Sequence, residues 1–163
     1  MPPLIAASLN CEIRLTLPAM LDCEWHKLNQ SKAKDDENMS VTGIDHVQIA
    51  APEGCEAEAR NFFARLLGLE EIEKPEPLRS RGGCWFKVGS RQLHIGIEEH
   101  FRPATKAHLA FAVKNIESVC AVLKGGGVLC VWDEALAEVR RFYVSDPWGN
   151  RLEFTESTCA DST

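Results

Sequence analysis

The stretch that decides the fold is GIDHVQIA, residues 43–50, followed after a short turn by CEAEARNFFARLLG, residues 55–68. Apolar and polar residues alternate in the first segment, which predicts a strand with one buried face. The second segment shows helical spacing of its apolar residues, and Gly68 stands where helices commonly end. The stripe consists of Ala59, Phe62, Phe63, Leu66 and Leu67. We therefore predict a strand followed by an amphipathic helix.

The same order of elements occurs twice. After the helix come strand candidates near residues 69–72, at CWFKV (84–88) and at QLHIGI (92–97). The order then restarts with a strand at AHLAFAV (107–113) and a helix that begins after Asn115, a residue suited to cap a helix N-terminus. Three further strand candidates follow, at VLCVW (128–132), EVRRFYV (138–144) and RLEFTE (151–156). Such an internal repeat predicts an α+β fold of two similar modules.

Composition limits the function classes. The chain has 163 residues, 45% of them apolar, and a net charge of −6. This fits one soluble globular domain, with no basic stripe for nucleic acid and no apolar run approaching the roughly 18 residues of a membrane span. The seven cysteines are odd in number and scattered, without a CxxC pair. They indicate thiols in a reducing, cytoplasmic compartment rather than a disulfide framework or a zinc knuckle.

The ends of the chain differ from the repeat. Residues 1–38 show weak periodicity and end in an almost wholly polar run, without the features of a secretory signal. We predict a poorly ordered N-terminal extension at 1–38, a domain at 41–157 with modules 41–98 and 106–157, and a C-terminal tail at 158–163. Met39 follows the extension directly, and one hypothesis is that residues 1–38 result from an upstream start codon.

Polar residues recur at equivalent places of the two modules. His108 follows His46 by 62 residues, each in the first strand of its module, and Glu153 follows His94 by 59 residues, each in the last strand. The alternation places all four opposite the apolar face on which the helix packs. If the two sheets curl around a common cavity, the four side chains converge inside it.

A single polar residue on a half-exposed strand is more often structural than a ligand. Three imidazoles and one carboxylate at equivalent positions of a repeat are different, because this set suits borderline divalent metals. We therefore predict a metal site of His46, His94, His108 and Glu153, holding Zn, Ni, Fe, Co or Mn. His26 and His100 fall outside the pattern.

The same alternation suggests side chains that face the cavity. It favours Gln48, Trp85, Arg141 and Tyr143 as substrate-binding candidates, with Lys87 on the face of Trp85. Arginine and tyrosine donors suit an anionic or enediolate-like oxygen. A surface arginine and a packing tyrosine are an equally valid interpretation, because a bulge reverses the alternation. Arg79 and Arg81, in LRSRGG, are expected in a loop that faces substrate or water.

Four segments resemble a known family: DHVQIAAP (45–52), EARNFFARLLGLEE (58–71), HLAFAV (108–113) and FYVSDPWGNRLEF (142–154). They resemble the vicinal oxygen chelate superfamily, which includes glyoxalase I, bleomycin-resistance proteins, fosfomycin-resistance proteins and extradiol dioxygenases. The resemblance covers about residues 41–157. It implies two βαβββ modules whose mostly antiparallel mixed sheets form a cup around a metal that the substrate chelates.

The resemblance also implies roles for individual residues. His46, His108 and Glu153 match the family's His, His and Glu ligands. Position 94 departs from glyoxalase I enzymes, which usually have a glutamate there that also moves the substrate proton. His94 would be a ligand or a proton shuttle, and His94 and Glu153 are the candidate bases.

The expected function is that of a metal-dependent, glyoxalase-like lyase or isomerase acting on a small oxygenated molecule. One alternative is a fosfomycin-type thiol transferase or a dioxygenase at the same His-His-Glu site. Another is a small-molecule binding or resistance protein without catalysis. Proteins of this superfamily often pair modules within or between chains, so a homodimer is also expected, swapped or unswapped.

Overall fold

The computed structural model describes residues 40–157. The unit Ile44–Thr163 contains every helix and strand described below. The predictions for residues 1–38, for the start at Met39 and for the tail at 158–163 concern residues outside the described range. Within residues 40–157, no helix has the length and apolar character needed to cross a membrane.

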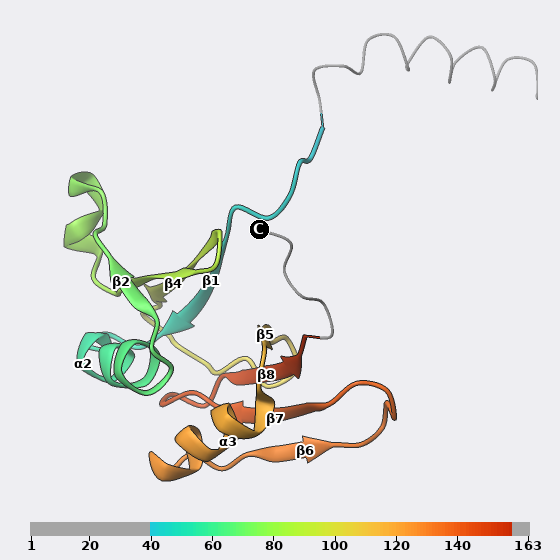
Figure 1. Ribbon diagram of the computed structural model, residues 1–163. Coiled ribbons are helices and arrows are strands. Elements are labelled where there is room, and N and C mark those ends of the chain that lie inside the picture. Colours follow the sequence, from blue (N-terminus) through green and yellow to red (C-terminus); the bar gives the residue numbers. More distant parts are fainter. Residues whose placement is uncertain (1–39, 158–163) are drawn as a thin grey trace, which may run out of the picture. The chain divides into compact units, whose positions relative to one another are not determined.

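The first module follows the predicted order. It consists of β1 (His46–Ala51), α2 (Glu56–Ala59), the π-helix η2 (Arg60–Leu66), β2 (Glu70–Ile72), the 3-10 helix η3 (Glu76–Arg81), β3 (Trp85–Val88) and β4 (Arg91–Ile97). Its four strands form one sheet in the order β1-β4-β3-β2, of which Figure 1 labels β1, β4 and β2. β1 is parallel to β4, and the other pairs are antiparallel.

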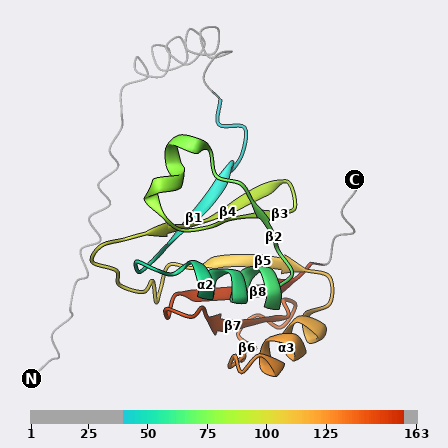
Figure 2. The same ribbon diagram turned by 90° about the vertical axis from the view of Figure 1, so that its left-hand side faces the viewer.

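The second module repeats this topology. It consists of β5 (Leu109–Val113), α3 (Ile116–Gly125), β6 (Val131–Asp133), β7 (Arg141–Ser145) and β8 (Arg151–Glu156). The sheet order is β5-β8-β7-β6, again with one parallel pair, β5 with β8. Figure 2 shows β5, β8 and β7 side by side. The predicted α+β class is confirmed, with two open, mixed sheets in the βαβββ arrangement of a cup-forming fold.

The first helix packs as predicted but winds differently. Ala59, Phe62 and Phe63 are buried, and the remainder of the stripe is half-buried. From Arg60 the segment is a π-helix, and the amide of Leu67 donates to the carbonyl of Phe62 at 3.0 Å. The predicted helix is present, but the π-type winding was not predicted. The wider turn reduces the angle between consecutive side chains, so two adjacent phenylalanines both reach the core.

The second helix begins and packs as predicted. The Asn115 side chain accepts a hydrogen bond from the Ser118 amide at 2.9 Å, which caps the helix. Ile116, Cys120 and Leu123 are buried. The core joins these side chains with four fully buried phenylalanines: Phe63, Phe86, Phe142 and Phe154.

The segment predicted as a loop at LRSRGG contains the 3-10 helix η3. Pro75 precedes it and proline also occupies its first turn, where a missing amide costs nothing. The helix ends at Gly82 (φ 65°) and Gly83 (φ 77°). A Cβ on Gly83 would lie 2.0 Å from the Ile95 carbonyl oxygen, so glycine is required for the chain to pass β4 closely.

The turn DPWGN connects more than two strands. Asn150 is buried, and its side-chain amide donates to the Ala50 carbonyl on β1 at 2.9 Å and to the Asp146 carboxylate at 2.7 Å. Its side-chain oxygen accepts from the Ala104 amide at 2.9 Å. One side chain therefore ties the last strand of the second module to the first module and to the segment between them.

Candidate functional site

In the first module the two candidate ligands form part of a stack of three rings. The His46 and His94 rings lie 4.2 Å apart, and the Trp85 ring lies 3.8 Å from His94 at an interplanar angle of 3°. Trp85 pairs directly with His94 in the sheet register. His94 is thus held between an indole and a second imidazole, which the alternation of residues alone did not predict.

The stack gives its two histidines different environments. His94 is only 4% exposed, and its Nε2 lies 2.9 Å from the Gln92 side-chain oxygen. Burial, and next the neighbouring His46, lower the pKa of His94 and so favour its neutral imidazole. His46 is exposed at the start of β1, and its Nδ1 donates to the Asp45 carboxylate at 2.7 Å. This leaves the His46 Nε2 available as a metal ligand.

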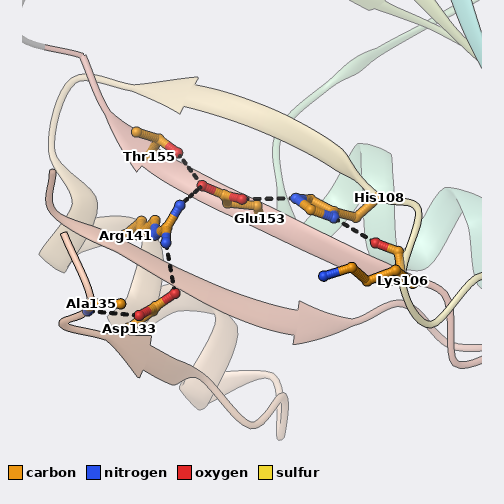
Figure 3. Close-up of polar contacts among 7 residues, drawn as sticks. All are labelled: Lys106, His108, Asp133, Ala135, Arg141, Glu153 and Thr155. Atoms are coloured by element: carbon orange, nitrogen blue, oxygen red, sulfur yellow. Dashed lines mark hydrogen bonds and ion pairs between the residues drawn. The ribbon is translucent and has the colours of Figure 1, made fainter. Parts of the chain in front are cut away.

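In the second module the candidate ligands touch each other. The His108 Nε2 lies 2.8 Å from the Glu153 Oε2 (Figure 3). The His108 Nδ1 lies 2.9 Å from the Lys106 carbonyl oxygen, which only accepts, so Nδ1 carries a proton. An unprotonated Nε2 and a carboxylate oxygen are both acceptors, so their close contact requires either a proton or a metal cation between them. A carboxylate and an unprotonated imidazole nitrogen are suitable ligands for such a cation.

Several further side chains orient the Glu153 carboxylate. The Thr155 hydroxyl donates to its Oε1 at 3.0 Å, and the Arg141 Nη1 lies 3.5 Å from the same oxygen. The other Arg141 terminal nitrogen, Nη2, donates to Asp133 at 2.8 Å (Figure 3). The Arg141 Nε is buried and has no hydrogen-bond partner among the residues that the structure describes. Burial alone would raise the pKa of Glu153, but the hydrogen bonds from Thr155 and His108 and the charge of Arg141 hold it below its usual value.

Asp133 is a member of this network that the sequence analysis missed. It lies on β6 directly opposite Arg141, which in turn lies opposite Thr155 on β8. The predicted strand covered residues 128–132 and so did not include Asp133, whereas β6 begins three residues later and ends at Asp133. The contact between Asp133 and Arg141 could be recognised only from the strand register.

The donors at His108 and Glu153 fit a divalent metal. Imidazole nitrogen and carboxylate oxygen are ligands that divalent metals commonly take, and these two atoms lie 2.8 Å apart. The second ring nitrogen of His108 and the second oxygen of Glu153 are already hydrogen-bonded, which is the outer support that metal ligands commonly have.

The four candidate ligands come together as two pairs, one in each module. Within residues 40–157, no group of three or more His, Cys, Asp or Glu side chains is close enough to hold a metal ion. All four side chains were predicted to converge if the two sheets curl around a common cavity. Each pair supplies two of the four predicted ligands.

The substrate-binding candidates surround these pairs. Gln48 and His108 line a cavity of about 370 Å³ between β1 and β5. The Tyr143 ring meets the His108 ring edge-on, with centroids 5.7 Å apart. Arg151 was not predicted, although it shares a face of β8 with Glu153; its guanidinium lies 3.7 Å over the Tyr143 ring. Trp85 belongs to the ring stack, whereas Lys87 approaches Glu70 at 4.0 Å.

The buried cysteines take no part in either pair. Cys55, Cys84, Cys120 and Cys130 are free thiols, as predicted for the described part of the chain. Burial raises the pKa of Cys84 and of Cys130 to about 12, so these two thiols are protonated at neutral pH and unsuited to nucleophilic chemistry.

Comparison with known proteins agrees with the fold and the repeat. The family model of the Glyoxalase/Bleomycin resistance protein/Dioxygenase superfamily matches residues 43–154. A solved structure of a protein from Bacillus anthracis assigned to the glyoxalase family is 52% identical, with a TM-score of 0.71, covering 74% of this chain and 99% of that one. None of the curated proteins matches the chain.

More distant structures share the fold. A glyoxalase family protein from Enterococcus faecalis is 28% identical, with a TM-score of 0.59, over 72% of this chain and 100% of that one. A genomically encoded fosfomycin resistance protein from Listeria monocytogenes is 18% identical, with a TM-score of 0.59, over 73% and 96%. The matched family model spans both modules and both pairs of candidate ligands. The chain therefore belongs to the glyoxalase, bleomycin resistance protein and dioxygenase superfamily.

Proposed function

We propose that this protein is a metal-dependent lyase or isomerase that acts on a small oxygenated molecule. The observation that carries the proposal is the contact between His108 and Glu153. Its 2.8 Å separation, with the outer atoms of both side chains already hydrogen-bonded, matches a pair of metal ligands. The metal would be a borderline divalent ion, because imidazole and carboxylate ligands suit such ions.

The remaining ligand comes, in this proposal, from a second copy of the chain. One chain presents a pair on each module, and neither pair is complete by itself. A two-fold dimer that places the first module of one copy against the second module of the other creates two equivalent sites. Each site then contains His46 from one copy and both His108 and Glu153 from its partner.

A bound divalent ion would supply Lewis acidity, which makes a C–H bond beside a coordinated carbonyl more acidic. His94 is the better candidate to accept the proton, because its pKa is lowered, first by burial, and its neutral ring is held by Trp85. Glu153 is the second candidate, but Thr155 and His108 already occupy its oxygens.

Arg141 and Tyr143 would stabilise the negative oxygen that develops when the proton leaves. Arg141 lies on the same strand as Tyr143 and already neutralises nearby carboxylates. The Tyr143 hydroxyl is a donor of the kind that stabilises such an oxygen. The proposed reaction thus involves three of the four substrate-binding candidates. The fourth, Gln48, lines the cavity beside His108.

Elemental analysis and activity measurements test the proposal together. We expect about one divalent metal per chain in the purified protein, loss of that metal in His108→Ala, and turnover that stops with a chelator and returns with metal. His100→Ala is the matched control, because His100 is exposed in the segment between the modules. Metal-free protein that binds small molecules without forming product would contradict the proposal and indicate a binding protein.

The product of the reaction separates the other enzymatic candidates. Thiol addition to an epoxide would indicate a fosfomycin-type transferase, and oxygen consumption with ring cleavage would indicate a dioxygenase. Either result would keep the metal site and replace the proposed reaction.

A further inference from the structure

A small cavity on the first module lies beside the ring stack. Its volume is about 220 Å³, and Trp85 and Gln48 form part of its wall. Gly96 contributes to the same wall, where a Cβ would lie 2.6 Å from the Gln48 side-chain nitrogen. The absence of a side chain at Gly96 therefore gives the Gln48 amide the space it occupies against β4.

The cavity is positively charged. Among residues 40–157, Lys74 and Arg81 are the only charged residues that line it, and no carboxylate of this range does so. Arg81 is exposed and forms no ion pair or side-chain hydrogen bond within residues 40–157. Lys74 donates to the Gly82 carbonyl, which leaves two of its three N–H groups for a ligand.

Three acidic side chains around η3 already have partners. Arg79, two residues before Arg81 on η3, pairs with Glu73 and with Glu76. Glu56 accepts a hydrogen bond from the Gly83 amide at 2.7 Å. Two cations thus face a cavity whose surrounding carboxylates already have partners.

The cavity adjoins the candidate catalytic histidine. Trp85 lines the cavity and stacks on His94 at 3.8 Å. Lys74 is close enough to lower the pKa of His94, although burial and then His46 contribute more. A group held in the cavity would therefore be next to the reacting part of the site.

The size of the cavity restricts what it holds. Pockets that enclose a whole ligand are usually about 300–1,000 Å³, so this cavity fits one group of a larger molecule. Leu78 and Ile97 supply apolar walls for the carbon atoms that carry this group. A guanidinium, an ammonium and an amide together form a donor set for a small oxyanion.

We propose that the cavity lined by Lys74, Arg81 and Gln48 binds an oxyanion of the substrate, a carboxylate, phosphonate or phosphate group. This inference rests on the proposed function, because it assumes that the reacting atoms lie at the neighbouring candidate metal site. The substrate is accordingly a small oxygenated molecule that carries a negative charge at one end.

The test uses inorganic phosphate and metal-free protein, so that phosphate has no metal to bind. The indole N–H resonance of Trp85 is the reporter, assigned among the four tryptophans by comparison with Trp85→Phe. We expect it to shift on titration with half-saturation at about 1 mM phosphate. The ionic strength is kept constant with sodium chloride, because salt screens exposed charges.

Two variants remove one charge each. Arg81→Gln and Lys74→Gln should each weaken phosphate binding about tenfold, the usual effect of losing one charge-assisted hydrogen bond. Lys74→Gln retains an N–H donor for the Gly82 carbonyl, which preserves the loop. Arg65→Gln is the control with the same change in charge, because Arg65 contacts Asn61 on η2 and does not line the cavity.

An unshifted Trp85 resonance, or equal weakening in Arg81→Gln and Arg65→Gln, would overturn the anion site. Because this readout involves neither metal nor turnover, it is independent of the metal proposal. If the wild-type protein binds phosphate but takes up no metal when metal is added, the anion site is supported and only the proposed function is rejected.

Discussion

The two halves of the candidate site occupy equivalent strands but differ in chemistry. In the first module the ligand candidates are stacked aromatic rings, with His94 between Trp85 and His46. In the second module Glu153 belongs to a charged network with His108 and Arg141. The candidate ligands therefore occupy equivalent strand positions in the two modules, while the side chains around them differ.

This difference suggests that the two modules contribute unequally to metal binding. The charged half fixes a carboxylate and an imidazole at ligand spacing, so it should contribute most of the metal affinity. The aromatic half positions His46 by stacking and keeps His94 uncharged by burial. Stacking between rings contributes only about 0.5–1.5 kcal/mol, so changes in this half should have smaller effects on metal binding.

The connection between the halves should give the largest effect. Asn150→Ala removes three side-chain hydrogen bonds and leaves polar groups on Ala50, Ala104 and the buried Asp146 without these partners. We expect the free energy of unfolding to fall by about 3 kcal/mol. Urea denaturation measures it, with Asn61→Ala, an exposed asparagine on η2, as the control. Equal losses in the two variants would contradict the role assigned to Asn150.

Within the charged half, Glu153→Gln should weaken metal binding by at least about 100-fold, equivalent to about 2.7 kcal/mol. The amide retains the size of the side chain but lacks the charge that attracts the ion. Competition with a fluorescent chelator measures the affinity. Glu156→Gln, on the same strand but paired with Arg140, should leave it unchanged. A similar loss in both variants would mean that general charge, not ligation, determines affinity.

Asp133→Asn should have an intermediate effect. Asp133 holds the Arg141 guanidinium, and its loss allows Arg141 to move onto Glu153 and compete with the metal. We expect metal affinity to fall about tenfold, within the range found for partners of metal ligands. Glu117→Gln is the control, because Glu117 pairs with the adjacent Arg140. Unchanged affinity in Asp133→Asn would exclude Asp133 from the site.

The aromatic half should give the smallest effect. Trp85→Leu removes the ring that supports His94, and through it His46, so metal affinity should fall about threefold. Trp132→Leu, a change at an exposed tryptophan of β6, should have no effect on the same titration. A larger loss of metal affinity in Trp85→Leu than in Asp133→Asn would contradict the proposal that the second module contributes most of the affinity.

The fold could be predicted largely from the sequence, because alternation, helical spacing and the repeat all depend on local periodicity. The order of elements, the Asn115 cap and the buried stripes were therefore predicted correctly. The π-helix and the 3-10 helix were missed. Both depend on how the segment packs against other elements, as with Phe62 and Phe63 or with Gly83 passing β4.

The candidate site could be predicted only in part. The alternation of side chains along a strand predicts the face of the sheet on which His94 or Glu153 lies, but not the distance between the two sheets. The ring stack, the contact from Asp133 to Arg141 and the separation into two pairs follow from register and tertiary arrangement. The role of Asn150 was not predicted, because its partners Ala50 and Ala104 lie far away in the sequence.

Mixing two variants that each lack one proposed ligand tests the shared site most directly. His46→Ala and Glu153→Gln proteins are purified separately, denatured together and refolded, and the metal content is measured. If each site takes His46 from one copy and Glu153 from the other, the mixed dimers regain one intact site. Random pairing then restores about a quarter of the wild-type metal content. Metal content no higher than in either variant alone would contradict a site shared between two copies.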